Sequence, residues 1–251
     1  MPQETMPTEN IICMKWGTRY DPMYVNILAS SVRRHLSRPH RFVCFTENAE
    51  GIDSQIEIRP LPELPLDLSL PERGWRKLTM LAEQLADLEG RALFLDLDIV
   101  IVGSLDPFFD EPGAFRIIRD WNLSGGWIGN SSVFRFEIGK HQDVLDYFLA
   151  HFAEIRKQFR NEQAFLSAAM RRKGILDYWD ASWCLSFKRH SIRPLPISLF
   201  CEPKRPNPET KIVVFHGQPN PHQVLSGWHC LKKLRWVKSA EWIRENWKIG
   251  N

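Results

Sequence analysis

Residues 92–98 read Ala-Leu-Phe-Leu-Asp-Leu-Asp, a short apolar run that ends in two aspartates. A run of this length is typical of a buried strand, and a carboxylate directly after such a strand must be solvated, hydrogen-bonded or bound to a cation. Carboxylate oxygens suit Mg²⁺ and Mn²⁺, ions that neutralise phosphate groups in enzymes. An Asp-x-Asp also occurs in ordinary structural turns. The position at a strand end, more than the motif itself, therefore marks Asp96 and Asp98 as candidate metal ligands.

Strands and helices are predicted to alternate around this stretch. Further apolar or β-branched runs predict strands at 11–14, 41–46, 99–102, 115–118 and 211–215. Helical spacing predicts helices that begin at Asp21-Pro22 and near Trp75, followed by helices over 144–159 and 161–170. The helix that begins near Trp75 would bury Leu78, Leu81, Ala82, Leu85 and Leu88. The alternation predicts an α/β fold with a mixed, mainly parallel sheet, helices on both faces, and ligands beyond the carboxyl ends of the strands.

Length and charge limit the class of protein. The chain has 251 residues, of which 43% are hydrophobic and 25% charged, as expected for a globular protein with a substantial core. We expect one catalytic domain over 1–224 and a basic, aromatic, helical appendage over 225–251. The formal net charge is only +3, which excludes the strong basic bias of a dedicated nucleic-acid binder.

Cysteine usage and apolar runs bear on the compartment. The five cysteines are widely spaced, which fits neither a disulfide framework nor a zinc-type Cys-x-x-Cys pair. Residues 1–10 lack the apolar core of a signal peptide, and no apolar run approaches the roughly 20 residues that cross a bilayer. The expected compartment is the cytoplasm, with any membrane contact made from the inner surface.

The longer stretch 92–108, Ala-Leu-Phe-Leu-Asp-Leu-Asp-Ile-Val-Ile-Val-Gly-Ser-Leu-Asp-Pro-Phe, resembles the Asp-x-Asp region of bacterial GT-A glycosyltransferases, most nearly those of family 8. Three more segments, 15–24, 74–78 and 215–217, match in the expected chain order, so the resemblance covers roughly residues 11 to 222. It implies a Rossmann-like GT-A fold, a divalent cation, and retaining transfer of a sugar from a nucleotide-diphosphate donor to a saccharide or lipid-linked acceptor.

The resemblance also implies a ligand set. Asp98 would be the principal metal ligand, Asp96 would be shared between the metal and the ribose, and His216 would complete the protein ligands. His222 is the alternative histidine, because the intervening loop 218–221 could approach the diphosphate. This loop departs from the family pattern Gly-x-x-Lys-Pro-Trp, so the family's lysine contact with phosphate does not carry over.

Residues before the aspartates are candidates for the nucleotide. By resemblance, Lys15, Gly17, Thr18 and Tyr24 would contact the base and ribose, although the helical spacing of Tyr24 also fits a core position. Lys77 lies at a predicted helix start, where free N–H groups and positive charge favour an anion. It is the candidate phosphate contact, and a solvated helix face is the alternative.

Two later segments are candidates for the sugar. Residues 125–133, Gly-Gly-Trp-Ile-Gly-Asn-Ser-Ser-Val, look like the family's Asn-Ser-Ser strand and offer Asn130 and Ser131 to the donor. Asp120 precedes them and could bind a sugar hydroxyl or simply cap a turn. Glu162 and Gln163 stand where related sequences carry Asp-Gln beside the anomeric carbon. An inverting mechanism with Glu162 or Asp120 as the base is the alternative to retention.

Segment 225–251 has six Lys or Arg against two Glu, interleaved with four tryptophans. It permits contact with an anionic membrane surface, and a helix packed on the domain with its lysines outward is the alternative. A haloacid-dehalogenase-type phosphatase also places Asp-x-Asp after an apolar strand, but that motif lies near the start of its domain. A noncatalytic nucleotide-sugar binding protein is the other alternative.

Overall fold

This computed structural model describes residues 7–66, 74–121, 126–231 and 234–250. Its centre is a seven-stranded sheet with the order β3-β2-β1-β4-β7-β6-β8. Neighbouring strands are parallel except at β7, which runs antiparallel to both β4 and β6. The prediction of a mixed, mainly parallel sheet is confirmed. The strands are β1 (Glu9–Lys15), β2 (His40–Thr46), β3 (Glu57–Arg59), β4 (Arg91–Leu95), β6 (Phe115–Arg119), β7 (Gly129–Glu137) and β8 (Leu176–Tyr178).

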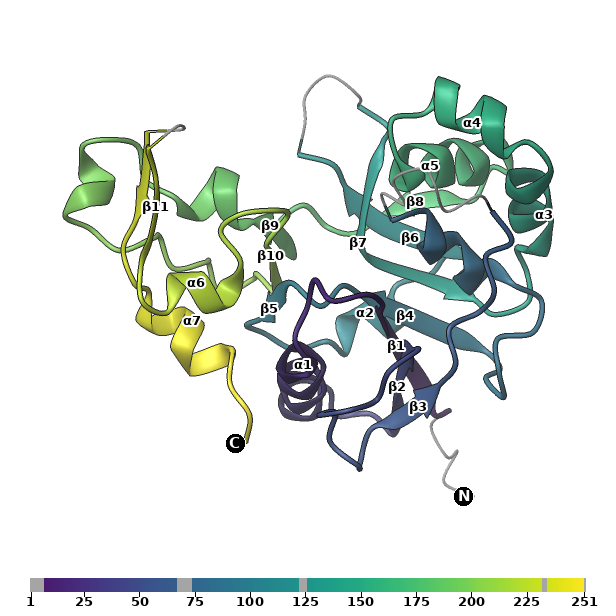
Figure 1. The fold of residues 1–251 in the computed structure, drawn as a ribbon, viewed down its shortest axis with the longest axis horizontal. Helices are drawn as coiled ribbons and strands as arrows, with labels where there is room; N and C mark the ends of the chain where they lie inside the picture. The colour runs from purple at the N-terminus through teal and green to yellow at the C-terminus, as the bar shows by residue number, and fades with distance from the viewer. Residues whose placement is uncertain (1–6, 67–73, 122–125, 232–233, 251) are drawn as a thin grey trace.

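Helices cover both faces of this sheet, as predicted (Figure 1). In β1, Ile11 and Cys13 pack into the apolar cluster that contains α1, whereas Ile12 and Met14 pack into the cluster that contains α5. Successive side chains of a strand point to opposite faces, so each central strand supplies two cores. One face carries α1 (Pro22–His35), α2 (Pro107–Asp110) and α7 (Glu241–Asn246), and the other carries the 3₁₀ helix η1 (Trp75–Leu81), α3 (Gln142–Ala150), α4 (Phe152–Gln158) and α5 (Glu162–Arg172).

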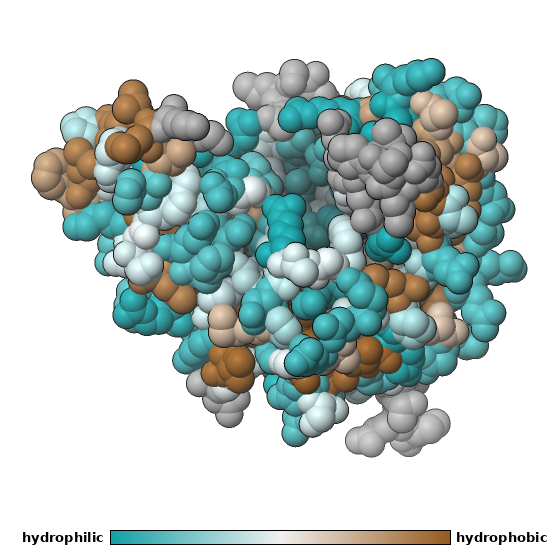
Figure 2. Space-filling view, in the orientation of Figure 1, coloured by the Kyte–Doolittle hydropathy of each residue, from teal (hydrophilic) through white to brown (hydrophobic). Residues whose placement is uncertain are grey.

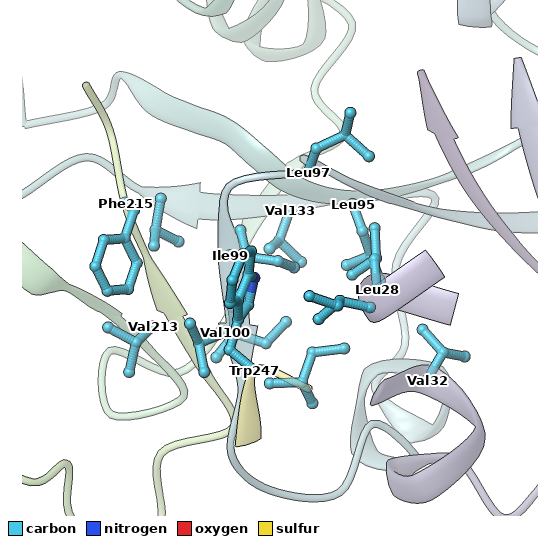
Figure 3. Close-up of a cluster of buried hydrophobic side chains, with 14 of the residues drawn as sticks. Leu28, Val32, Leu95, Leu97, Ile99, Val100, Val133, Val213, Phe215 and Trp247 are labelled. Atoms are coloured by element: carbon cyan, nitrogen blue, oxygen red, sulfur yellow. The ribbon is translucent and has the colours of Figure 1, made fainter. Parts of the chain in front are cut away.

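A second, three-stranded sheet begins directly after the two aspartates. It has the order β5-β10-β9, with β5 (Ile99–Ile101) antiparallel to β10 (Ile212–Val214) and β9 (Cys184–Ser186) parallel to β10. The backbone N–H of Phe215 donates to the carbonyl oxygen of Asp98 at 2.9 Å. Figure 3 shows that side chains from β4, β5 and β10 share one core with α1 and Trp247. The aspartates therefore lie where the chain passes between two sheets that share a core.

Local signals predicted the starts of two helices correctly. The Asp21 side chain accepts a hydrogen bond from the N–H of Met23 at 2.8 Å, with Pro22 as the first residue of α1. The Asn161 side chain caps α5 by accepting from the N–H of Ala164 at 3.3 Å. Each helix thus begins where its capping residue satisfies a free N–H group.

Two helices are shorter than predicted. The helix near Trp75 is only the 3₁₀ helix η1, because Ala82 is extended and Ala86 has a positive φ of 52°. The apolar residues of the predicted stripe are buried through consecutive turns, as in the hydrogen bond from the N–H of Leu88 to the carbonyl of Leu85 at 3.1 Å. The long helix over 144–159 is wrong as well. It is divided into α3 and α4 at His151, whose φ of −123° and ψ of 25° are not helical.

The segment after 224 is not the helical appendage expected from its composition. The short helix α6 (Pro221–Val224) is followed by a hairpin of β11 (Trp228–Cys230) and β12 (Arg235–Val237) and then by α7. Trp242 and Trp247 are buried in the core that contains α1. Arg34 of α1 donates hydrogen bonds to the carbonyls of Asn246 and Gly250. Burial of these indoles outweighs the basic, amphipathic pattern and makes the segment part of the domain.

The remaining elements are a short π-helix, η3 (Phe187–Ser191), and a 3₁₀ helix, η4 (Ile197–Leu199). Within the described segments, no helix combines the length and apolar character that crossing a bilayer requires. All five cysteines are free thiols.

Candidate active site

A cavity of about 440 Å³ opens where β1 and β4 end. The N-terminal parts of β7 and α5 reach the same edge, because β7 runs antiparallel to β4. Figure 2 shows a hollow near the centre of this face. Eight of the predicted site residues line the cavity: Lys77, Asp96, Asp98, Asn130, Ser131, Glu162, Gln163 and His216. The carboxyl ends of the strands therefore bring together residues up to about 140 positions apart, as the α/β reading requires.

The two aspartates form the acidic side of the cavity. Asp98 is only 7% exposed, and its carboxylate accepts a hydrogen bond from the Tyr20 hydroxyl at 2.7 Å. Burial, and next the negative charge of Asp96, raise the pKa of Asp98 to about 6, although the Tyr20 hydrogen bond opposes this shift. A buried pair of like charges of this kind favours a proton or a cation between them.

Lys77 carries the balancing positive charge. Its Nζ lies 2.6 Å from a carboxylate oxygen of Asp96 and 3.4 Å from the Ser131 hydroxyl. Burial alone would lower the pKa of Lys77, but the attractions of Asp96, Glu162 and Asp98 outweigh it and raise that pKa. Lys77 is thus a buried charge partner, and the expectation of an exposed lysine at a helix start is wrong. Trp75, two residues before Lys77, is buried against Phe148. This part of η1 therefore packs toward the core.

Glu162 and Gln163 line the cavity from the start of α5. Glu162 is 6% exposed and accepts a hydrogen bond from the Ser131 hydroxyl at 2.8 Å. Burial raises the pKa of Glu162, and the positive charge of Lys77 opposes that change. The Gln163 side-chain oxygen accepts from Asn130 and from the Ser131 N–H, both at 3.4 Å. The four side chains form one hydrogen-bonded wall facing the aspartates.

Gly74 lets this wall close. Its φ of 84° lies in the left-handed region, and an added Cβ would come within 3.0 Å of the Glu162 carboxylate. Any larger residue would displace Glu162.

His216 lies two residues after β10 and lines the same cavity. Its Nε2 shares a 2.6 Å hydrogen bond with the Ser186 hydroxyl, in a direction set by the imidazole tautomer. The imidazole stacks on Trp121 with ring centroids 5.6 Å apart. Burial, and then the charge of Lys188, lower the pKa of His216 to about 4. The ring is therefore neutral at pH 7, which is the form that binds metals.

The predicted metal ligands line one cavity but do not form a metal-binding cluster. Among the described residues, no three or more His, Cys, Asp or Glu side chains come together closely enough to hold a metal ion. Lys77, Tyr20 and Ser186 instead satisfy Asp96, Asp98 and His216, since buried polar groups require partners. The donor set still fits a hard divalent cation: two carboxylates and a neutral imidazole, with an acidic repulsion that a cation would relieve.

Five predicted residues do not line this cavity. Tyr24 is a core residue, 4% exposed, whose hydroxyl is hydrogen-bonded to His222 and whose ring packs on Trp247 at 5.1 Å. His222, the alternative ligand, is engaged in this contact and does not line the cavity. Lys15 is buried at the end of β1, and Thr18 is exposed. The N–H of Gly17 donates to Glu47 at 2.6 Å, and the N–H of Asp120 donates to the Ile128 carbonyl at 2.9 Å.

Other residues line the cavity without having been predicted. Trp16, Arg19 and Tyr20 belong to the segment singled out as a nucleotide-binding opening, but different members of it were chosen. No periodic signal exists in this loop between β1 and α1, so the sequence cannot tell which side chains turn inward. Asn161 also lines the cavity, although it was not predicted as a site residue. An asparagine before a helix is common as an N-cap, so its presence there does not by itself indicate a binding role. Of the Gly-rich segment 125–133, residue 125 lies outside the described residues.

No protein-family model and no curated protein matches the sequence. Among solved structures, the chain is similar to the galactosyltransferase LgtC in complex with donor and acceptor sugar analogues, with a TM-score of 0.59, 17% identity and 94% of each chain covered. It is also similar to the glycosyltransferase GlyE of Streptococcus pneumoniae, with a TM-score of 0.57 and 14% identity over 85% of this chain and 56% of GlyE. A third similar structure is that of the bifunctional glycosyltransferase WbbM, with a TM-score of 0.54, 11% identity, and 85% of this chain and 46% of WbbM covered.

The similarity to LgtC extends over 94% of both chains. This shared architecture leaves the phosphatase alternative without structural support. The chain has the GT-A fold of glycosyltransferases.

Proposed function

We propose that this chain is a metal-dependent glycosyltransferase that moves a sugar from a nucleotide-diphosphate donor to a saccharide or lipid-linked acceptor. The observation that carries the proposal is the cavity at the ends of β1 and β4, where Asp96 and Asp98 face Lys77 and Glu162. The similar structure of LgtC is a complex with donor and acceptor sugar analogues, which supports the same class of ligands.

Asp96, Asp98 and His216 are the residues that would hold the divalent cation, Mn²⁺ or Mg²⁺. When bound, the ion would neutralise the negative charge of the departing diphosphate. Lys77 supplies a second positive charge beside Asp96, and it is the proposed phosphate contact from this chain. The Tyr20 hydroxyl donates a hydrogen bond to Asp98, and this bond would have to be released for that carboxylate to hold the ion.

The donor is proposed to lie between the loop after β1 and the wall formed by β7 and α5. Trp16, Arg19 and Tyr20, which line the cavity, are proposed to face the nucleotide. Lys15, Gly17 and Thr18 do not line it and stay predicted contacts. Asn130 and Ser131 then present their polar side chains to the sugar hydroxyls.

Glu162 and Gln163 are proposed to act at the anomeric carbon. They line the same cavity as the aspartates, whereas Asp120 does not line it. The carboxylate and the amide oxygen can stabilise positive charge that develops on the sugar ring as the diphosphate leaves. We assign a retaining mechanism with this pair beside the anomeric carbon. An inverting product would instead make Glu162 the base that deprotonates the acceptor.

We propose that the protein acts in the cytoplasm. Contact of residues 225–251 with an anionic membrane surface stays a prediction. Two tryptophans assigned to that contact, Trp242 and Trp247, are buried and unavailable. Exposed apolar side chains of this region include Phe200, which follows η4, and Leu231 and Leu234, which lie between β11 and β12. Helix η4 contacts β12. Flotation with anionic vesicles of Leu234→Asp beside the unaltered protein tests whether this surface binds lipid without disturbing the core.

A screen of nucleotide sugars with Mn²⁺ or Mg²⁺ tests the proposed function. We expect one donor to bind and to be hydrolysed slowly in the absence of acceptor. Donor binding without hydrolysis, and without transfer to any saccharide, would favour the noncatalytic binding protein. Absence of binding to every donor would contradict both interpretations.

A further inference from the structure

A second cavity lies apart from the aspartates, at the other end of α5. Its volume is about 360 Å³, and it is formed by the end of β6, by β8, by the end of α5 and by the residues before β7. Its charged and aromatic lining residues are Arg119, Trp127, Arg171 and Tyr178. We call it the Arg119–Arg171 pocket. None of these four residues belongs to the proposed reaction.

Each arginine in this pocket lies against an aromatic ring. The guanidinium of Arg119 lies 4.0 Å from the ring centroid of Tyr178, and that of Arg171 lies 5.2 Å from the ring centroid of Trp127. Backbone contacts hold the pocket together, since Arg119 donates to the Gly126 carbonyl at 2.8 Å and the Tyr178 hydroxyl donates to the Trp127 carbonyl. The rings restrict how far the two cations can turn from the pocket.

The positive charge of the pocket is not balanced by nearby acids. Among the described residues, neither Arg119 nor Arg171 forms an ion pair, whereas nine other arginines and lysines do, including Arg38, Arg41 and Lys173. Both guanidiniums are exposed, and Trp127 is 36% exposed. Burial raises the pKa of Tyr178, and the charges of Arg119 and Arg171 oppose that shift, which places both cations near the same phenol.

This combination of side chains matches one ligand chemistry. A guanidinium binds a carboxylate or phosphate through two parallel hydrogen bonds, and an exposed indole ring offers an apolar surface to the C–H face of a sugar. The pocket is thus suited to a sugar that carries a negative charge.

The pocket is connected to the candidate active site through two rigid elements. Glu162 and Arg171 lie near opposite ends of α5, about 14 Å apart along its axis. Trp127 precedes Asn130 by three residues, a separation of at most about 10 Å. The N–H of Gly129 donates to the Ser167 hydroxyl at 2.8 Å, which joins β7 to α5 between the two cavities. A saccharide that reached from one cavity to the other would have to extend about 14 Å along α5.

We propose that the Arg119–Arg171 pocket binds an acidic sugar residue of the acceptor saccharide. That this sugar belongs to the acceptor rests on the proposed function, whereas the binding of an acidic sugar in the pocket does not. The structure supports a carboxylated or a phosphorylated sugar equally, because the guanidinium geometry suits both anions.

An NMR titration without donor or metal tests the proposal, with the indole N–H signal of Trp127 assigned by its loss in Trp127→Phe. The probes are trigalacturonate against neutral maltotriose, and glucose 6-phosphate against glucose, all at one ionic strength because general charge attraction is screened by salt. We expect at least one acidic probe to bind about tenfold more tightly than its neutral match. Whichever acid binds identifies the source of the negative charge.

Variants locate the binding. Arg171→Gln and Arg119→Gln are each expected to weaken the acidic probe about five- to twentyfold. The control is Arg172→Gln, which removes the same charge from the adjacent position of α5 but whose guanidinium lies over Tyr147 instead. Equal binding of acidic and neutral probes, or equal weakening in Arg171→Gln and Arg172→Gln, would overturn the proposal. Since no donor is present, that result would leave the donor screen unaffected, and a failed donor screen would leave this pocket intact.

Discussion

The ammonium group of Lys77 lies 2.6 Å from a carboxylate oxygen of Asp96, and both side chains are largely buried at the floor of the candidate active site. Glu162 adds a second negative charge nearby, as its effect on the pKa of Lys77 shows. A buried ion pair contributes little net stability, but removal of one partner leaves an uncompensated charge in a region of low dielectric. A substitution in this pair is therefore expected to change both the free energy of unfolding and the binding of ligands.

Replacement of Lys77 by methionine is expected to lower the free energy of unfolding by about 3 kcal/mol, because Asp96 and Glu162 lose their positive partner. Methionine retains most of the apolar stem, so the loss reports on charge. Urea unfolding at pH 7 measures it, with the exposed Lys157→Met as the control. A loss no larger than that of Lys157→Met would contradict the role of Lys77 as the charge partner of Asp96 and Glu162.

Replacement of Asp98 by asparagine is expected to remove metal-dependent turnover of the nucleotide sugar, with a fall of at least about 10²- to 10³-fold. Asparagine keeps the size and one carbonyl oxygen, but it lacks the negative charge that would hold the cation. Donor hydrolysis with Mn²⁺ measures the effect, and circular dichroism checks the fold. Full wild-type activity in a chelator, or unchanged turnover in the variant, would contradict metal dependence.

The same substitution is expected to stabilise the metal-free protein at neutral pH. The pKa of Asp98 is about 6 in the folded protein and near 3.8 when unfolded. Folding therefore favours the protonated carboxyl, and stability falls as pH rises from about 4 through about 6. Roughly 3 kcal/mol is at stake for a shift of this size. Thermal unfolding in a chelator should show Asp98→Asn more stable than wild type at pH 7, with the difference smaller at pH 4.

Glu162→Gln and Asp120→Asn separate the two candidate catalytic carboxylates. Only Glu162 lines the cavity, so its substitution is expected to lower kcat by about 10²- to 10⁴-fold, while Asp120→Asn changes it by less than about fivefold. The anomeric configuration of the product, followed by NMR before mutarotation, distinguishes retention from inversion. A larger loss in Asp120→Asn would show that Asp120 is the catalytic group.

Trp242→Ala is expected to destabilise the protein by about 3–5 kcal/mol, since the indole is buried in the core shared with α1. Trp236 is only half-buried, so Trp236→Ala should cost less than half as much. Thermal or urea unfolding measures both. Equal, small effects would make the segment after 224 an independent appendage, as its composition had indicated.

Local patterns in the sequence were enough to predict much of this protein. The apolar run before Asp96 predicted a buried strand, and the pairs Asp21-Pro22 and Asn161-Glu162 marked helix starts, because hydrophobic period and capping act over a few residues. The alternation of these elements predicted a layered α/β fold, in which the strand ends share one edge. That rule predicted that Asp96 and Asp98 lie at the edge where ligands bind. The resemblance to family 8 glycosyltransferases was needed to add Glu162, and the predicted helix start was needed to add Lys77.

Only the tertiary structure decided which way individual side chains point. Tyr20 turns to Asp98 while Tyr24, four residues later, turns to His222, a partner 198 positions away. His216 meets Ser186, and Lys77 is buried rather than exposed. Such choices depend on hydrogen bonds and packing between segments that are far apart in the chain, and a polar group buried by those segments must take whichever partner they place beside it.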